Sequence, residues 1–190
     1  YFSPVVVATP AYSYNTTDAG PPYPVGIRVQ KLNVTSFQVK VDRPNGALTG
    51  NNKTRVDYFV VEEGNWTMPG SSISLQAGVV RTTKTGYNGL TTWSSITYSD
   101  FITFRQPFTV APAVYHTRCS DSNPTLWAVT YSSAPNARTS APTTTQMALG
   151  LNRGQLGTAT FANNETLCWV AITGGGNAGN ISGTNWSKEI

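Results

Sequence analysis

The chain has 190 residues and a formal net charge of +4, and charged side chains make up only 12% of it. The basic residues are spread along the chain without a Lys/Arg run, which argues against nucleic-acid binding because that function needs a clustered basic surface. No stretch approaches the roughly 20 apolar residues of a membrane-spanning helix, so we expect no membrane span. Ser, Thr and Asn supply the polarity, and 17 glycines and 12 prolines supply turns, a composition typical of an all-β protein.

Short β-branched and aromatic runs follow one another along the whole chain. The alternation at residues 25–30 and 37–41 predicts a hairpin with one buried and one solvated face. No window has sustained helical periodicity, so we expect no long helix. The full set of predicted strands covers residues 2–9, 25–30, 37–41, 55–62, 73–81, 93–104, 108–115, 126–131, 146–151 and 167–172.

One strand pattern occurs twice, at residues 55–64 and 167–175. Each copy is an apolar run that ends at glycine, and each follows an Asn-Asn-x-Thr sequence. We interpret both as the closing strand of a β unit and predict two tandem antiparallel β-sandwich units. The boundaries are residues 1–70 for the first unit, 71–92 for a connecting segment with an extra strand, 93–176 for the second unit, and 177–190 for a Gly/Asn-rich tail with a donor strand.

Cys119 and Cys168 are the only cysteines, and His116 is the only histidine. This set is too small for a zinc site. We predict a disulfide that joins two strands of the second unit; two buried free thiols are the alternative.

Seven Asn-x-Ser/Thr sequences occur, about twice the number expected by chance. N-glycosylation requires the secretory route, which also permits a disulfide. We therefore expect a secreted, extracellular protein with Tyr1 as its mature N-terminus; accidental matches in an Asn/Thr-rich chain are the alternative. The predicted N-glycosylation sites are Asn15, Asn33, Asn52, Asn65, Asn164, Asn180 and Asn185. The candidate O-glycosylation sites, in a Ser/Thr/Pro loop, are Thr139, Ser140, Thr143, Thr144 and Thr145.

The sequence offers little for catalysis. Glu62 and Glu63 are adjacent on a strand, so their side chains point to opposite faces, unlike the facing carboxylates of a glycosidase. The sequence has no serine motif typical of a nucleophile elbow, so we do not expect His116 to act as a general base. We predict no enzyme, no catalytic or metal-binding residue and no cofactor apart from covalent glycans. The candidate sugar contacts are the aromatic residues Tyr23, Trp66 and Tyr87, with packing within loops as the alternative.

Residues 58–64 have the sequence Tyr-Phe-Val-Val-Glu-Glu-Gly, which resembles the Tyr-Leu-Ala-Ile-Glu-x-Gly strand of H-type lectin-like repeats. Residues 4–7 and 27–41 are similar to earlier strands of that family. The second copy keeps Trp93, residues 112–114 (Pro-Ala-Val) and residues 169–175, but has Thr173 in place of the glutamate. The resemblance implies a six-stranded sandwich per unit in a secreted, oligomeric protein whose characterised relatives bind sugars such as N-acetylgalactosamine. The family's sugar contacts have no identifiable counterparts in this chain.

The first predicted unit has no counterpart of residues 93–104, the opening strand of the second unit. Residues 183–190 resemble residues 90–96, so a strand is missing at one end and spare at the other. We expect copies to assemble head to tail by strand exchange into an extracellular fibre or coat. The alternatives are pairing by residues 73–81 within the chain, a disordered tail, a carbohydrate-binding module, and an accessory domain of a larger surface enzyme. The predicted assembly interface comprises Phe2, Val5, Val6, Val7, Trp186 and Ile190.

Overall fold

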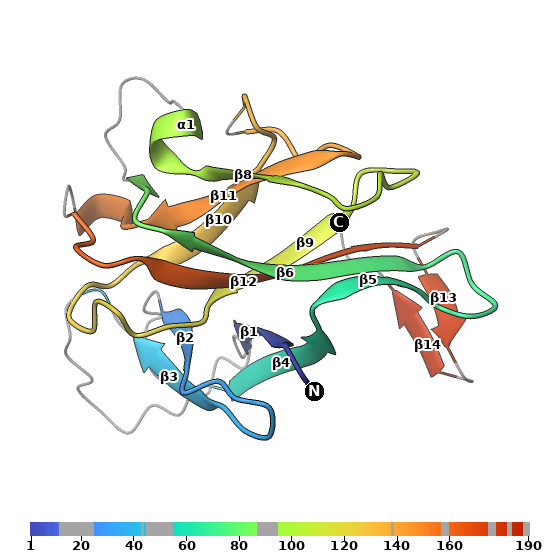
Figure 1. Cartoon of the computed structure of the whole chain (residues 1–190), viewed down its shortest axis with the longest axis horizontal. Helices are drawn as coiled ribbons and strands as arrows, with labels where there is room; N and C mark the ends of the chain where they lie inside the picture. The colour runs from blue at the N-terminus through green and yellow to red at the C-terminus, as the bar shows by residue number, and fades with distance from the viewer. Residues whose placement is uncertain are drawn as a thin grey trace, which may run out of the picture.

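The computed structural model describes residues 1–11, 25–42, 44, 55–86, 95–137, 139–156, 160–174, 178–181 and 184–187. These residues form an all-β fold in which strands from distant parts of the chain lie side by side (Figure 1). The described helical segments are short, namely the four-residue helix α1 (Ser95–Tyr98) and a 3-10 turn at Gly154–Leu156.

The largest sheet has six strands in the order β3-β2-β9-β12-β6-β5. These strands are β2 (Gly26–Gln30), β3 (Gln38–Asp42), β5 (Gly64–Thr67), β6 (Ser74–Thr82), β9 (Ala113–Arg118) and β12 (Glu165–Thr173).

A second sheet is built on β11, which pairs with three other strands. Its members are β7 (Thr85–Gly86), β8 (Asp100–Thr103), β10 (Val129–Ser133) and β11 (Gln146–Asn152). Two antiparallel pairs complete the fold, β1 (Pro4–Ala11) with β4 (Arg55–Glu62) and β13 (Ala178–Ile181) with β14 (Thr184–Ser187).

Strand β12 contributes to both hydrophobic cores. Cys168 and Val170 point to a core that includes the valines of β1, whereas Leu167 and Trp169 point to a core beneath β11. Successive side chains of a strand lie on opposite faces, so a strand buried on both faces has a continuous apolar sequence. This burial explains why residues 167–172 lack the apolar–polar alternation of a surface strand.

The two halves of the chain repeat the same antiparallel pairing. In the first half β1 pairs with β4 and β2 with β3; in the second, β9 pairs with β12 and β10 with β11. The halves do not form separate sandwiches, however. Strands β2 and β3 join the sheet of β9 and β12, and β1 packs in one core with Cys119, Cys168 and Val170. Residues assigned to different predicted units therefore share a sheet and a core.

The extra strand predicted at residues 73–81 is present as β6, and it pairs with β12 over its full length. Gly78 of β6 lies opposite Trp169, where an added Cβ would come within 2.9 Å of the indole ring. Glycine therefore permits this close pairing. Strand β6 pairs with β12 of the second half and not with β4 of the first half. It therefore does not occupy the place of the missing strand in the first predicted unit.

The prediction of one strand over residues 93–104 is partly wrong. Within its described residues, a helical turn, α1, precedes the short strand β8. The carbonyl of Tyr98, the last residue of α1, accepts a hydrogen bond from the hydroxyl of Tyr131 (2.6 Å). A contact between distant residues thus accompanies the turn, and tertiary contacts of this kind override local strand propensity.

Candidate functional site

Three of the seven predicted N-glycosylation sites have described side chains. Asn33 and Asn164 are exposed, and Asn65 is half-buried on the edge strand β5. The Asn33 side-chain oxygen accepts hydrogen bonds from the backbone N–H of Thr35 (2.9 Å) and of Ser36 (2.8 Å), which fixes the β2–β3 turn. Asn180 and Asn185 lie on β13 and β14, with side chains outside the described set. Asn15 and Asn52 lie outside the described residues.

The candidate O-glycosylation loop precedes β11. Thr139, Ser140, Thr143 and Thr145 are exposed, and Thr144 is half-buried. The Thr143 hydroxyl accepts the backbone N–H of Gln146 (2.9 Å) and so caps the start of β11. The Thr143 hydroxyl also lies 3.4 Å from the hydroxyl of Thr145, so both side chains take part in the structure of this loop.

The predicted disulfide between Cys119 and Cys168 is present. It joins Cys119, the residue that follows β9, to Cys168 in the middle of β12, and both cysteines lie in the core that also contains β1. The bond therefore fixes the surface on which the N-terminal strand packs.

Three residues of the predicted assembly interface, Val5, Val6 and Val7, lie on β1. All three are buried within their own chain, because β1 pairs with β4 and packs on the six-stranded sheet. Phe2 precedes β1 and is 98% exposed. The side chain of Trp186 on β14 and the whole of Ile190 lie outside the described set.

The outer edge of β4 carries backbone groups that no described strand pairs with. The Ala8 N–H donates to Thr117 Oγ1 (2.6 Å), away from β4, so Ala8 and its opposite residue Tyr58 form a non-hydrogen-bonded pair of the β1–β4 ladder. By alternation, Val56, Tyr58 and Val60 direct their N–H and C=O groups to the outer edge of β4. We call these three residues the β4 edge.

The β4 edge is closed at one end and has apolar side chains beside it. The indole N–H of Trp66 donates to the Glu62 carbonyl (3.2 Å), where the strand ends. Tyr58 and Phe59 are 63% and 48% exposed, and the Tyr58 ring packs edge-on against Phe37. A strand edge without a partner and with exposed aromatic residues beside it is a template for pairing with another strand.

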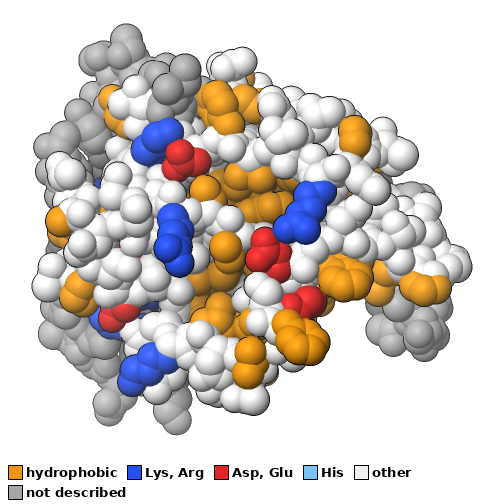
Figure 2. Space-filling view, viewed as in Figure 1, with side chains coloured by type: hydrophobic (Ala, Val, Ile, Leu, Met, Phe, Trp, Pro, Cys, Tyr) orange, Lys and Arg blue, Asp and Glu red, His pale blue; other side chains and the backbone are white. Residues whose placement is uncertain are grey.

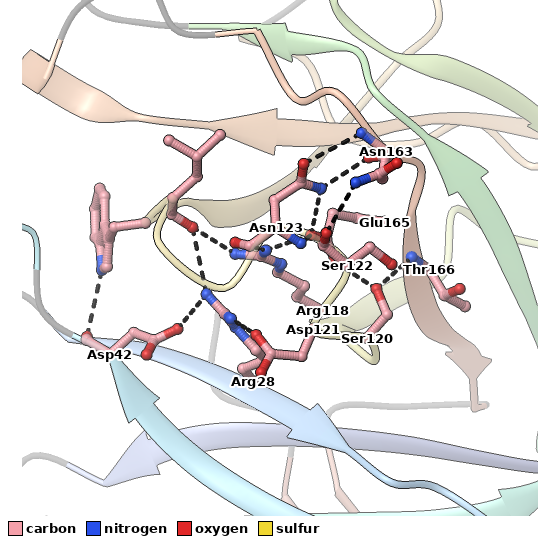
Figure 3. A network of polar contacts seen from close by, with 12 residues as sticks. Arg28, Asp42, Arg118, Ser120, Asp121, Ser122, Asn123, Asn163, Glu165 and Thr166 are labelled. Carbon is pink, nitrogen blue, oxygen red and sulfur yellow. Dashed lines mark hydrogen bonds and ion pairs between the residues drawn. The ribbon is translucent and has the colours of Figure 1, made fainter.

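A buried polar network lies where β2 meets β9 (Figure 3). The Glu165 carboxylate is completely buried, pairs with Arg118, and accepts hydrogen bonds from Ser120 and from the backbone N–H of Asn123 (2.8 Å). Arg118 also donates to the Leu126 carbonyl (2.8 Å). The network therefore holds residues 120–126 against the start of β12.

Arg28 on β2 extends this network. Its guanidinium pairs with Asp42 (2.6 Å) on β3 and with Asp121, and only 1% of its side chain is exposed. Arg28 and Arg118 are directly opposite in the single bridge between β2 and β9. Burial lowers the pKa of Arg28, and repulsion from the positive charge of Arg118 lowers it further. Attraction to the carboxylates of Asp42 and Glu165 acts in the opposite direction. Hydrogen bonds from Arg118, Ser120 and Asn123 outweigh burial and hold the pKa of Glu165 below its usual range. The Glu165 carboxylate is consequently ionised at neutral pH, and the geometry of the network supports a structural role.

A groove of about 700 Å³ runs along the other part of β9. Five consecutive residues of β9, residues 113–117, line the groove. Because successive side chains of a strand point to opposite faces, the groove must follow the edge of β9 and not one of its faces. Beyond the Arg28–Arg118 bridge, no described strand pairs with that edge. The opposite wall is formed by β1 and by residues 57–59 of β4. The groove therefore lies between the first and the second half of the chain.

His116 lines this groove and is neutral at physiological pH. Its Nδ1 lies 2.7 Å from Thr130 Oγ1, and burial lowers the pKa of His116 to about 4. The unfolded chain, with an ordinary histidine pKa near 6.5, therefore binds the proton more tightly than the folded chain.

We expect the free energy of unfolding to fall as the pH is lowered from about 6.5 to about 4, by up to about 3 kcal/mol from His116. Urea unfolding at each pH measures this slope, and His116→Gln should flatten it above pH 5. An unchanged slope in the variant would contradict the assignment. Glu165 adds a separate loss at lower pH, where its carboxylate becomes protonated.

Of the three candidate sugar contacts, Trp66 is described and is 45% exposed on β5. Tyr23 and Tyr87 lie outside the described residues. On the face shown in Figure 2, hydrophobic side chains gather over the middle of the molecule, and basic and acidic side chains alternate around them. The described basic side chains on this face therefore form no continuous stripe.

Within the described part of the chain, no group of three or more His, Cys, Asp or Glu side chains is arranged to hold a metal ion. No helix among the described residues is long and apolar enough to cross a membrane. Comparison with protein-family models, with curated proteins and with solved structures gave no match.

Proposed function

We propose that this chain is a secreted, N-glycosylated structural subunit, not an enzyme, that assembles head to tail by strand exchange into an extracellular fibre or coat. The observation that carries the proposal is a difference between equivalent strands. β12 has partners on both sides, β9 and β6, whereas its counterpart β4 pairs only with β1 among the described strands. Likewise β11 pairs with β10 and β8, whereas its counterpart β3 pairs only with β2.

The order of the strands suggests the donor. Strand β4 is followed by the hairpin β5–β6, and β6 pairs with β12. Strand β12 is in turn followed by the hairpin β13–β14, and β14 pairs only with β13 among the described strands. By this equivalence, β14 of one copy would pair with the β4 edge of another, as β6 pairs with β12.

In a head-to-tail contact, the donor strand of one copy binds the acceptor edge of the next. The assembly therefore always has a free donor at one end and a free acceptor at the other, where a further copy can bind. Such a contact propagates into a filament unless its rotation closes a ring. Backbone hydrogen bonds would supply the affinity and alternate side chains the register. The exposed Asn33 and Asn164 would carry glycans on the outside of the assembly.

Tyr58→Pro tests the proposal without breaking the β1–β4 ladder, because the Tyr58 N–H points away from β1. We expect the wild-type chain to form concentration-dependent polymers in light scattering and the variant to lose at least one hydrogen bond per contact, which weakens association about tenfold or more. Tyr58→Ala is the matched control, because it also removes the ring contact with Phe37 but keeps the N–H, and it should still assemble. Wild-type chains that stay monomeric at high concentration, or equal assembly of both variants, would refute the proposal.

A carbohydrate-binding module is the second candidate, favoured by the exposure of Trp66. The hydrogen bond from its indole to Glu62 holds the ring in place at the surface, as a sugar-stacking platform requires. Glycan-array binding that Trp66→Ala abolishes is the expected result for this function. An array without any signal for the wild type would exclude it.

A further inference from the structure

We propose that the groove beside β9 binds one small, uncharged, largely apolar ligand that hydrogen-bonds at one end to His116 and to the backbone of Val114. The groove shares Tyr58 with the β4 edge of the strand exchange proposed above, but its occupant would be a small molecule and not a strand. The groove lies between the two halves of a single chain, and β1, β4, β9, β10 and the end of β12 contribute to its walls.

The size and lining of the groove determine the kind of ligand. About 700 Å³ is within the usual range for small-molecule sites, which are mostly apolar with a few convergent polar groups. Val7, Ile27, Ile73, Val129 and Ile172 are among the lining residues. Burying apolar surface against such side chains is the main source of affinity in a site of this type.

The backbone of β9 provides unpaired polar groups in the groove. The Cys119 N–H donates to the Thr166 carbonyl (2.7 Å), which marks a hydrogen-bonded pair of the β9–β12 ladder. By alternation, Val114 and His116 turn their backbone groups away from β12 and towards the groove edge. The His116 carbonyl accepts the Thr130 hydroxyl (3.3 Å), whereas no hydrogen bond joins the Val114 backbone at this edge to any described residue.

The charges of the lining favour a neutral ligand. Asp57 is the one carboxylate among the described lining residues; its side chain is 51% exposed and is already paired with Arg55 (2.9 Å). His116 adds no charge near neutral pH, because its pKa is about 4. A charged ligand would lose its hydration without gaining a partner ion, which is costly.

Fluorescence titration with N-phenyl-1-naphthylamine, a neutral and apolar probe with one N–H donor, tests the site on the full chain. We expect one probe to bind per chain. Ala111→Trp places an indole at the exposed rim of the groove and should weaken binding about tenfold or more. Ala162→Trp is the matched control, because Ala162 is equally exposed and does not line the groove, and it should bind like the wild type.

Light scattering on the same variants separates this proposal from strand exchange. We expect Ala111→Trp to keep the assembly state and thermal midpoint of the wild type while losing the probe. Equal probe affinity in all three proteins would overturn the proposal. It would equally be overturned if the wild type bound no probe and Ala111→Trp abolished self-association, since the groove would then be occupied by a second copy.

Discussion

Replacing Glu165 by Gln is expected to lower the free energy of unfolding by about 3–5 kcal/mol, the range for breaking a buried ion pair from one side. Gln keeps the size of the side chain but removes its charge. The Arg118 guanidinium, of which 1% is exposed, would then remain buried without its carboxylate. The amide would also present a donor where Ser120 and Asn123 donate to the carboxylate. Urea unfolding at pH 7 measures the change.

Asp57→Asn is the control for this prediction. Asp57 also pairs with an arginine, Arg55, but both side chains are more than half exposed. Exposed pairs contribute about 0–1 kcal/mol, so this variant should unfold almost like the wild type. If both variants lost a similar free energy of unfolding, burial would not be the reason why the Glu165–Arg118 pair stabilises the fold.

Removing the disulfide with Cys119→Ala and Cys168→Ala together is expected to cost about 4 kcal/mol. The bond closes a loop of 49 residues, and the loss of loop-closure entropy in the unfolded chain scales with that length. The effect should be seen as a lower denaturation midpoint. Both cysteines are in the core that holds β1, so near-ultraviolet circular dichroism should report loosened packing as well.

The reduced wild-type chain provides a control for the double variant. Treatment with a thiol reductant should shift the wild-type midpoint to that of the variant and leave the variant unchanged. A shift below about 1 kcal/mol in both experiments would mean that strand pairing alone holds β9 against β12.

Most of the strands could be predicted from short stretches of sequence, because β-branched runs and turn residues determine where a strand begins and ends. The closing strands β4 and β12, the hairpin β2–β3 and the extra strand β6 lie where β-branched runs and turn residues indicated. The disulfide was also predicted, because the dense Asn-x-Ser/Thr sequences indicated the secretory route, which permits a disulfide.

The sequence could not indicate how the two halves combine. Pairing between β2 and β9 is a single bridge between residues 90 positions apart, and no periodicity encodes it. Arg28 alternates with apolar residues and was therefore expected on the solvated face, yet it is buried with Asp42 and Asp121. Glu165 precedes the predicted strand at residues 167–172, and only its contact with Arg118 shows its role.

The same reason applies to the N-terminal strand. The run Val5, Val6 and Val7 is equally typical of an exposed donor strand and of a strand buried on both faces. Its location is decided by β4 and by the sheet of β9 and β12, on which it packs. This burial is the reason why the proposed strand exchange uses β14 as the donor and not β1.

Hydrogen exchange at the backbone amides of Val56, Tyr58 and Val60, measured below and above the concentration at which the chain associates, tests strand exchange most directly. These three amides should exchange quickly in the monomer and become protected in the assembly, while those of Val61 and Phe59, already paired with β1, are protected in both. Assembly that leaves the β4 edge exchanging at the monomer rate would contradict the account.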